Sequence, residues 1–122
     1  MRLSLESGPA GNRIRGYAPG RVYVGETVYR RSFAVSAEQL VADWGPAIFD
    51  DLTSNDLAML AAFNPEVVIL GCGATQRFPE PATIAPLTSR GIGVEVMETG
   101  AACRTFNVLL AEDRRVVAAL IL

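Results

Sequence analysis

The segment that most restricts the fold of this chain is an uninterrupted apolar run, Val67 to Leu70, followed at once by Gly71-Cys72-Gly73. A short run that is rich in β-branched residues is typical of a strand buried on both faces. Strands of this kind lie inside parallel sheets whose faces are covered by helices. The run therefore predicts an α/β fold.

Helices and strands alternate around this run from residue 53 onward. Thr83 and Thr99 are placed to cap two helices, and Pro86 then falls in a first turn, where its missing N–H is harmless. The expected elements are a helix from the capping box at Thr53 to Asn64, the strand 67–70, a helix ending before Gly91, the strand 94–97, a helix over 99–113 and the strand 116–121. This βαβαβ order predicts right-handed crossovers and a largely parallel sheet.

The first 45 residues differ, because Gly and Pro interrupt short stretches of β-forming residues. Gly25-Glu26 between Val-Tyr-Val and Thr-Val-Tyr predicts a hairpin with a type II′ turn. Phe33 and Val35 alternate with small residues and predict another strand. Residues 37–44 fit either a short helix or an extended segment.

Length and patterning together predict one compact domain over residues 1–122, since this length is close to the usual size of a single hydrophobic core. We expect an α/β fold with a central mixed, largely parallel sheet, flanking helices and an N-terminal β-hairpin region. Residues 1–45 are expected to be mainly β, and residues 53–122 to form a βαβ-type half.

The composition excludes several chemistries, because the chain has no His and all 11 of its basic residues are Arg. Ser-His-Asp and Cys-His catalysis, His-ligated metals, Schiff bases and a phosphate-binding lysine are ruled out. Cys72 and Cys103 cannot form a metal site by themselves. We therefore assign no catalytic residue, metal ligand or cofactor, and expect a protein that binds rather than catalyses.

Charge and hydropathy indicate the expected surroundings of the protein. A net charge of −2 gives no reason to expect nucleic-acid binding. The longest apolar run, Val116 to Leu122, is too short for a bilayer, which takes ~20 residues, and Met1 to Glu6 lack the apolar core of a signal peptide. We expect a cytoplasmic protein without an integral membrane segment, with both thiols reduced and no disulfide between them.

Two segments are candidates for one binding site. Gly71-Cys72-Gly73 stands where a dinucleotide loop would stand, although a turn that needs positive φ explains its glycines better. The helix from Thr99 offers N–H groups and Arg104, which suit an anion or a carboxylate. In the structural alternative Thr99 caps the helix and Arg104 pairs with a nearby glutamate. The residues assigned to this site are Gly71, Cys72, Gly73, Thr99, Arg104, Thr105 and Asn107.

Three stretches of the sequence resemble one known family. They are Val-Ile-Leu-Gly-Cys-Gly at 68–73, Arg-Gly-Ile-Gly-Val-Glu-Val-Met-Glu-Thr at 90–99, and Ala-Ala-Cys-Arg-Thr-Phe-Asn-Val-Leu-Leu-Ala-Glu-Asp-Arg-Arg-Val at 101–116. The family comprises small uncharacterised α/β proteins of bacteria and archaea, together with the mitochondrial complex I assembly factor 3. The resemblance implies a compact α/β domain without an established enzyme activity. Through its mitochondrial member it also implies a protein partner during assembly of the respiratory NADH dehydrogenase.

Three functional hypotheses follow. The leading one is a non-catalytic binding module that helps to assemble a membrane-associated respiratory complex. The alternative is a protein or enzyme that binds a small anion or ligand between Gly71–Gly73 and the start of the 99–113 helix. A third is a homodimer, formed through an edge strand or through the loop Trp44–Phe49, which either folds onto the core or forms an apolar surface.

Overall fold

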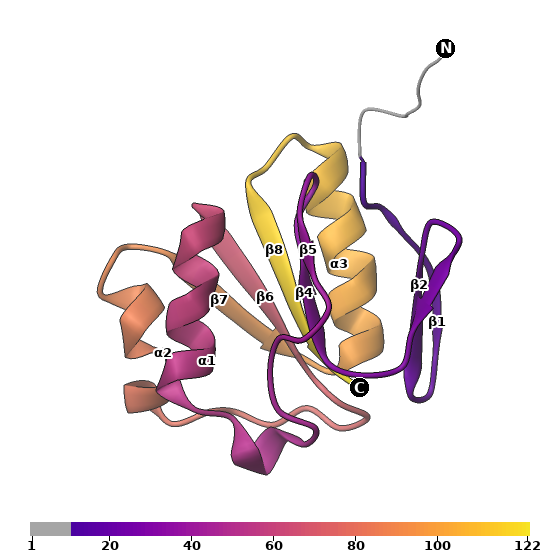
Figure 1. Ribbon diagram of the computed structural model, residues 1–122. Helices are drawn as coiled ribbons and strands as arrows, with labels where there is room; N and C mark the ends of the chain where they lie inside the picture. Colours follow the sequence, from indigo (N-terminus) through magenta and orange to yellow (C-terminus); the bar gives the residue numbers. More distant parts are fainter. Residues whose placement is uncertain (1–10) are drawn as a thin grey trace.

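A five-stranded sheet runs through the middle of the protein (Figure 1). The computed structural model describes residues 11–122, and the earlier part of the expected β-rich segment lies outside them. The strand order is β5-β4-β8-β6-β7. β8 (Val116–Ile121), β6 (Val67–Cys72) and β7 (Gly93–Met97) are parallel, whereas β4 (Phe33–Val35) and β5 (Leu40–Val41) extend the sheet in antiparallel pairing. The predicted mixed sheet is thus confirmed, with parallel pairing at β8, β6 and β7 and antiparallel pairing at β4 and β5.

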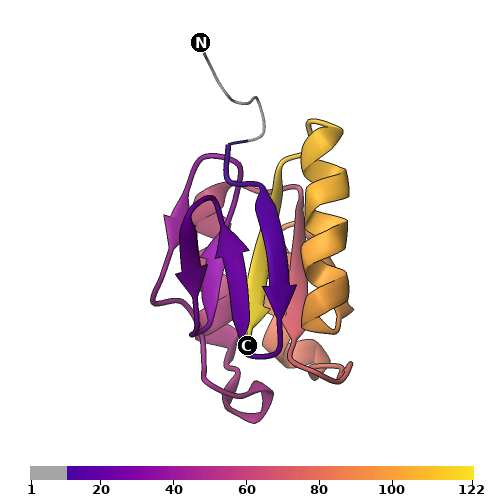
Figure 2. The same ribbon diagram turned by 90° about the vertical axis from the view of Figure 1, so that its right-hand side faces the viewer.

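Helices cover one face of this sheet, and a helix and a second sheet cover the other. α1 (Ser54–Met59), the 3-10 turn Leu60–Phe63 and α2 (Pro81–Thr88) lie on the first face. On the second face α3 (Thr99–Ala111) lies beside a small antiparallel sheet, as Figure 2 shows. The strands of that sheet are β1 (Ile14–Ala18), β2 (Arg21–Val24) and β3 (Thr27–Tyr29).

Two apolar cores result, one on each face of the central sheet. Phe33, Ile69 and Phe106 are fully buried on the α3 side. Leu57 and Leu70 are fully buried on the α1 side. All residues of β6 and of β8 are buried, because both faces of these two strands are covered. The apolar run from Val67 therefore forms a strand that is buried on both faces, as its sequence predicts.

Several local predictions are confirmed. Gly25 has a φ of 57° in the β2–β3 turn, as the predicted hairpin needs at that position. Both hydrogen bonds of the capping box between Thr53 and Asp56 form at the start of α1. The segment 37–44, which the sequence left open, contains the extended strand β5.

The loop from Trp44 to Phe49 before α1 is partly folded onto the core and partly exposed, so both alternatives left open by the sequence apply to parts of it. Trp44 is buried, and its Nε1 donates a hydrogen bond to the carbonyl oxygen of Asp56 at 2.8 Å. Ile48 in the same loop stays 55% exposed. A short 3-10 helix follows at Phe49–Asp51. The tryptophan thus anchors the loop to the core while its tip remains exposed.

Two predicted helix caps are wrong. α2 begins at Pro81 after an extended Glu80, because a proline needs no hydrogen-bond acceptor for an N–H in the first turn; Pro86 therefore lies inside the helix, and Thr83 is not its cap. α3 is capped by the side chain of Glu98 rather than by Thr99. The hydroxyl of Thr99 has other partners, described below.

Candidate functional site

The carboxyl ends of β6 and β8 meet the start of α3, and Thr99 links all three elements. Its hydroxyl donates a hydrogen bond to the carbonyl oxygen of Ile121 at 2.6 Å and accepts one from the N–H of Gly73 at 2.8 Å. Its own N–H donates to the carbonyl oxygen of Gly73 at 2.9 Å. Thr99 is therefore saturated by contacts inside the protein.

Gly71 and Gly73 serve this link in different ways. A Cβ on Gly71 would lie 3.0 Å from both Thr99 Oγ1 and Leu120 Cδ2, so a larger residue would separate α3 from the sheet. Gly73 has a φ of 100°, a left-handed conformation that favours glycine. The glycines thus fit the turn and close packing that the sequence favours over a dinucleotide loop.

Cys72 organises the loop between β6 and α2. Its buried Sγ lies 3.1 Å from the carbonyl oxygen of Met97 and accepts the N–H of Arg77 at 3.1 Å. Gln76 Nε2 donates to the carbonyl oxygen of Val96 at 3.2 Å, so the loop is fastened across the end of β7. The thiol is enclosed by its own loop rather than presented to a substrate.

The other cysteine is part of the core. Cys103 is buried on α3 among apolar residues, and this burial raises its pKa to about 12. Its thiol therefore stays protonated at neutral pH. Neither cysteine forms a disulfide, as the sequence predicts.

Arg104 binds a tyrosine, not a glutamate. Its Nη1 donates a hydrogen bond to the hydroxyl of Tyr17 in β1, and its guanidinium lies 5.7 Å from the centre of the Tyr17 ring. The ring rests on Gly100, where a Cβ would come within 2.7 Å of it. Sequence reasoning missed Tyr17, and the small residue at the helix start was the signal for a close contact there.

Asn107 joins α3 to β1 farther along the helix. Its Nδ2 donates to the carbonyl oxygen of Ile14 at 2.7 Å, and its Oδ1 accepts the N–H of the same residue at 2.9 Å. Eight residues of helix place Asn107 about 12 Å from Thr99. Thr105 makes no side-chain hydrogen bond within residues 11–122. The predicted site residues therefore do not form one constellation.

A pocket of about 480 Å³ opens between the β1–β2 turn and the start of α3. Tyr17, Pro19, Ile121 and Leu122 give it apolar walls, and Gly73 and Gly100 contribute backbone. Among the described residues that line it, Glu98 alone has a charged side chain. The pocket thus lies where the sequence places a ligand, but its walls suit an apolar group.

Three of the hydrogen-bond donors at this helix start, the N–H groups of Thr99, Ala101 and Ala102, already have partners. The carboxylate of Glu98 accepts the N–H of Ala101, and the Glu98 carbonyl oxygen accepts that of Ala102 at 2.9 Å. The N–H of Gly73 donates to the hydroxyl of Thr99, and the N–H of Thr99 donates to the carbonyl oxygen of Gly73. Because a carboxylate already caps the positive end of the helix, a second anion would meet a like charge.

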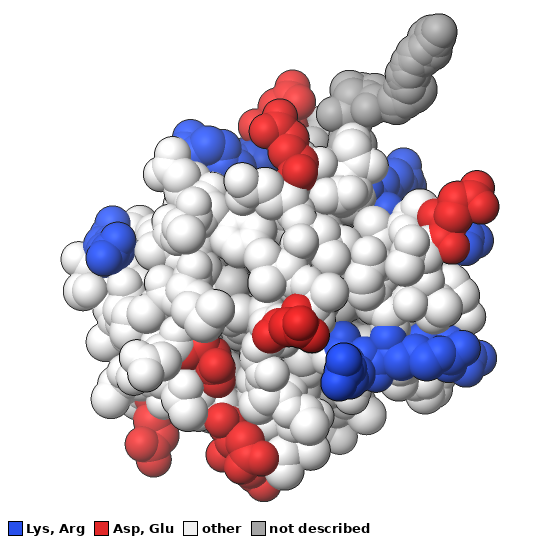
Figure 3. Space-filling view, viewed as in Figure 1, with Lys and Arg blue, Asp and Glu red and all other residues white. Residues whose placement is uncertain are grey.

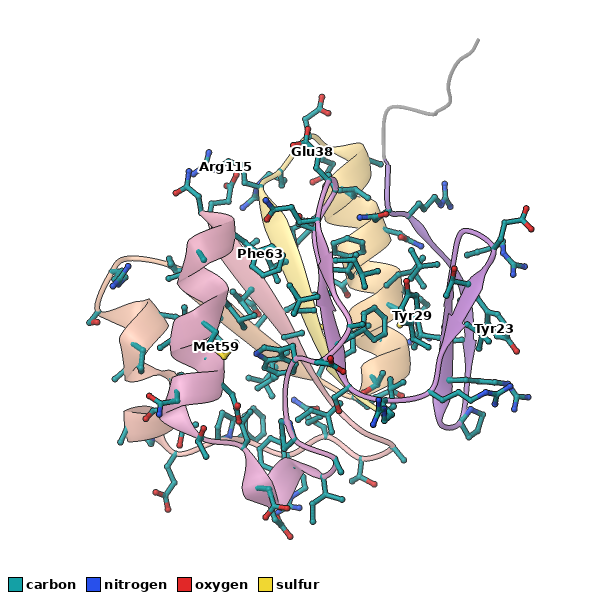
Figure 4. The ribbon with its side chains drawn as sticks, in the orientation of Figure 1. Tyr23, Tyr29, Glu38, Met59, Phe63 and Arg115 are labelled. Atoms are coloured by element: carbon teal, nitrogen blue, oxygen red, sulfur yellow. The ribbon has the colours of Figure 1, made fainter. Side chains whose placement is uncertain are left out.

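A second groove, of about 510 Å³, lies on the opposite side of the sheet over β5. Trp44, Met59 and Phe63 contribute to it, and Figure 4 shows Met59 and Phe63 on the same stretch of α1 and the following turn. No charged residue within the described range lines this groove, and uncharged atoms dominate the centre of this face in Figure 3. It is a further apolar surface within residues 11–122.

Comparison with known proteins gives the family of the chain. The profile of a family described as "Protein of unknown function (DUF498/DUF598)" matches residues 14–121. This protein belongs to the DUF498/DUF598 family. The family resemblance seen in the sequence is thereby confirmed.

Relatives of this DUF498/DUF598 protein carry different names. The "13 kDa major membrane protein" of Francisella tularensis subsp. holarctica is 31% identical, with 95% of each chain covered. The "NADH dehydrogenase [ubiquinone] 1 alpha subcomplex assembly factor 3" of Danio rerio is 33% identical over 99% of this chain and 70% of its own length. A crystal structure of a Bordetella parapertussis protein matches with a TM-score of 0.87 and 37% identity, over 94% of this chain and 98% of that one. The fold is thus shared along nearly the whole chain.

Two further observations bear on this DUF498/DUF598 protein. Within residues 11–122 no helix has the length and apolarity that a bilayer-spanning helix needs. The same residues contain no cluster of three or more Cys, Asp or Glu side chains arranged to hold a metal ion.

Proposed function

We propose that this DUF498/DUF598 protein is a non-catalytic binding module that assists the assembly of a membrane-associated respiratory complex. The observation that carries the proposal is its 33% identity with a NADH dehydrogenase assembly factor over 99% of the chain. Because the alignment spans almost the whole domain, the shared part includes both apolar surfaces and the start of α3.

The state of the reactive groups supports binding over catalysis. Cys72 is enclosed by its loop, Cys103 is buried and protonated, and Thr99 is saturated by internal hydrogen bonds. Unpaired cysteines are also typical of a reducing compartment, so we propose a cytoplasmic location. Binding of a protein partner is the function that the apolar surfaces support best.

The proposal is tested by affinity capture from the cells that make this protein. Tagged protein is recovered under mild detergent, and the captured proteins are identified by mass spectrometry. We expect subunits of the respiratory NADH dehydrogenase, together with a loss of the assembled complex on native gels when the gene is deleted. Capture of no respiratory subunit by folded protein, with normal complex in the deletion strain, would contradict the proposal.

A further inference from the structure

We propose that the pocket beside the start of α3 takes an apolar side chain of the partner protein, and that Arg104 binds a carboxylate next to that side chain. The inference rests on the proposed function, since it names the surface that the partner contacts. The partner segment is therefore apolar at one position and acidic close by.

The shape and chemistry of the pocket support the apolar half of this proposal. Its volume of about 480 Å³ lies in the range of small-ligand pockets and admits one large side chain. Tyr17, Pro19 and Ile121 supply apolar wall, and no atom lies within 4 Å of where a Cβ on Gly73 would stand. The N–H groups of Thr99, Ala101 and Ala102 are occupied by Glu98 and by Gly73, and Glu98 adds a negative charge to the pocket wall, so the pocket interior favours an apolar group over an anion.

The rim supports the acidic half; we define it as Tyr17, which lines the pocket, and Arg104, which lies beyond the lining and donates a hydrogen bond to the Tyr17 hydroxyl. Tyr17 is 43% exposed and Arg104 is exposed, and these two residue types are enriched among the residues that dominate protein interfaces. The hydroxyl of Tyr17 takes one of the five N–H donors of Arg104, which orients the guanidinium. Within residues 11–122 no carboxylate forms an ion pair with Arg104, so its charge is available to an acidic partner.

The groove over β5 does not support a comparable proposal about a partner. Trp44, Met59 and Phe63 offer apolar surface, but no charged side chain of the described residues lines the groove to orient a partner. The pocket beside α3, by contrast, has a concave apolar wall, and its Tyr17 orients the adjacent cation of Arg104. For this reason the proposal concerns the pocket, and the groove serves as a comparison surface in the test.

Titration of the ¹⁵N-labelled protein with small probes tests the pocket directly. The probes are N-acetyl-phenylalanine, which has an apolar side chain and a carboxylate, its uncharged amide, and acetate. We expect the amide signals of Gly73, Ala74 and Gly100 to shift with the first two probes and not with acetate. Because an exposed ion pair contributes modestly, the acid should bind about 1.5- to 5-fold more tightly than the amide.

Variants assign the two halves of the proposal. Ala74→Trp places an indole at an exposed position in the pocket wall and should abolish binding of both probes. Ala82→Trp, at an exposed position of α2, is the matched control and should bind like the wild type. Arg104→Ala should retain binding of the amide and remove the advantage of the acid. Absence of shifts at the pocket, or equal binding by Ala74→Trp, would overturn the proposal.

The same variants separate this proposal from the proposed function. In affinity capture, Ala74→Trp should lose the respiratory subunits that the wild type and Ala82→Trp recover. If Ala74→Trp captures them equally well, the partner binds elsewhere and the pocket proposal fails while the assembly role stands. If the wild type captures none, the assembly role fails, and the probe titration still decides whether the pocket binds an apolar acid.

Discussion

Two neighbouring parts of the molecule differ in whether their polar groups are used up by hydrogen bonds inside the protein. We define the joint as Gly71, Cys72, Gly73 and Thr99. In the joint, the described side-chain hydrogen bonds are all made with main-chain groups of the protein. In the rim of Tyr17 and Arg104, one hydrogen bond orients the pair and leaves donors exposed to solvent. The difference indicates that the joint stabilises the fold and that the rim is available for binding.

The largest effect is expected for overpacking the joint. Gly71→Val places methyl groups against Thr99 and Leu120, where a Cβ alone already comes within 3.0 Å. We expect the free energy of unfolding to fall by about 3 kcal/mol, the upper part of the usual range for overpacked cores. Urea denaturation followed by circular dichroism measures it.

Gly16→Val is the matched control, because Gly16 also lies in a strand but a Cβ there meets only Tyr23, at 3.9 Å. Its free energy of unfolding should change by less than about 0.5 kcal/mol. Equal destabilisation by the two variants would show that the strands resist any valine, and that the joint is not specially close-packed.

A smaller loss is expected when the joint loses its hydroxyl. Thr99→Val keeps the shape of the side chain but removes the hydrogen bonds to Ile121 and Gly73. Leaving these partly buried groups unpaired should cost about 2 kcal/mol in urea denaturation. Thr105→Val is the control on the same helix and should be close to neutral; a similar loss there would mean that threonine hydroxyls stabilise α3 in general.

The smallest effect is expected at the opposite end of the parallel strands, where Glu66 precedes β6. Glu66 accepts hydrogen bonds from the Arg115 N–H and from the Arg114 side chain, and these, the N–H first, lower its pKa. Its carboxylate therefore stabilises the fold above the pKa that glutamate has in the unfolded chain, and this contribution is lost as pH falls through the lowered pKa. Because the carboxylate is partly exposed to solvent, the effect is small.

Stability measured against pH checks this prediction. Wild type should be slightly more stable than Glu66→Gln at neutral pH, and the two should converge in acid. Glu112→Gln removes an exposed carboxylate that makes no ion pair within residues 11–122, and it is the control for the loss of one negative charge. If the free energy of unfolding differs between wild type and Glu66→Gln by the same amount at every pH, the effect does not come from the charge of the carboxylate.

Local pattern was enough to predict the framework of the fold. The apolar run of β6, the hairpin at Gly25 and the capping box at Thr53 all depend on neighbours within a few residues. The caps of α2 and α3 were mistaken because more than one nearby residue can start a helix. At α3 the side chain of Glu98 reaches the N–H of Ala101, which leaves the Thr99 hydroxyl for a strand 22 positions away.

The site itself depended on contacts that no local pattern contains. Arg104 and Tyr17 are 87 positions apart, and Asn107 and Ile14 are 93 apart. Both contacts require β1 to lie beside α3, which follows only from the packing of the small sheet. Of the residues that the sequence assigns to a site, Gly73 and Thr99 line the pocket at the start of α3. Neither the apolar walls of this pocket nor the partner of Arg104 could be predicted.

The central claim is that saturated residues stabilise the fold whereas the rim binds the partner, and one paired measurement tests it most directly. Asn107→Ala and Arg104→Ala are compared at equal concentrations of folded protein for capture of respiratory subunits, with urea denaturation alongside. We predict that Asn107→Ala is about 2 kcal/mol less stable but captures normally, since it loses two hydrogen bonds to Ile14 outside the pocket. Arg104→Ala should keep its stability and capture less of the respiratory subunits than the wild type; capture equal to that of the wild type by Arg104→Ala, or loss of capture by Asn107→Ala, would contradict the claim.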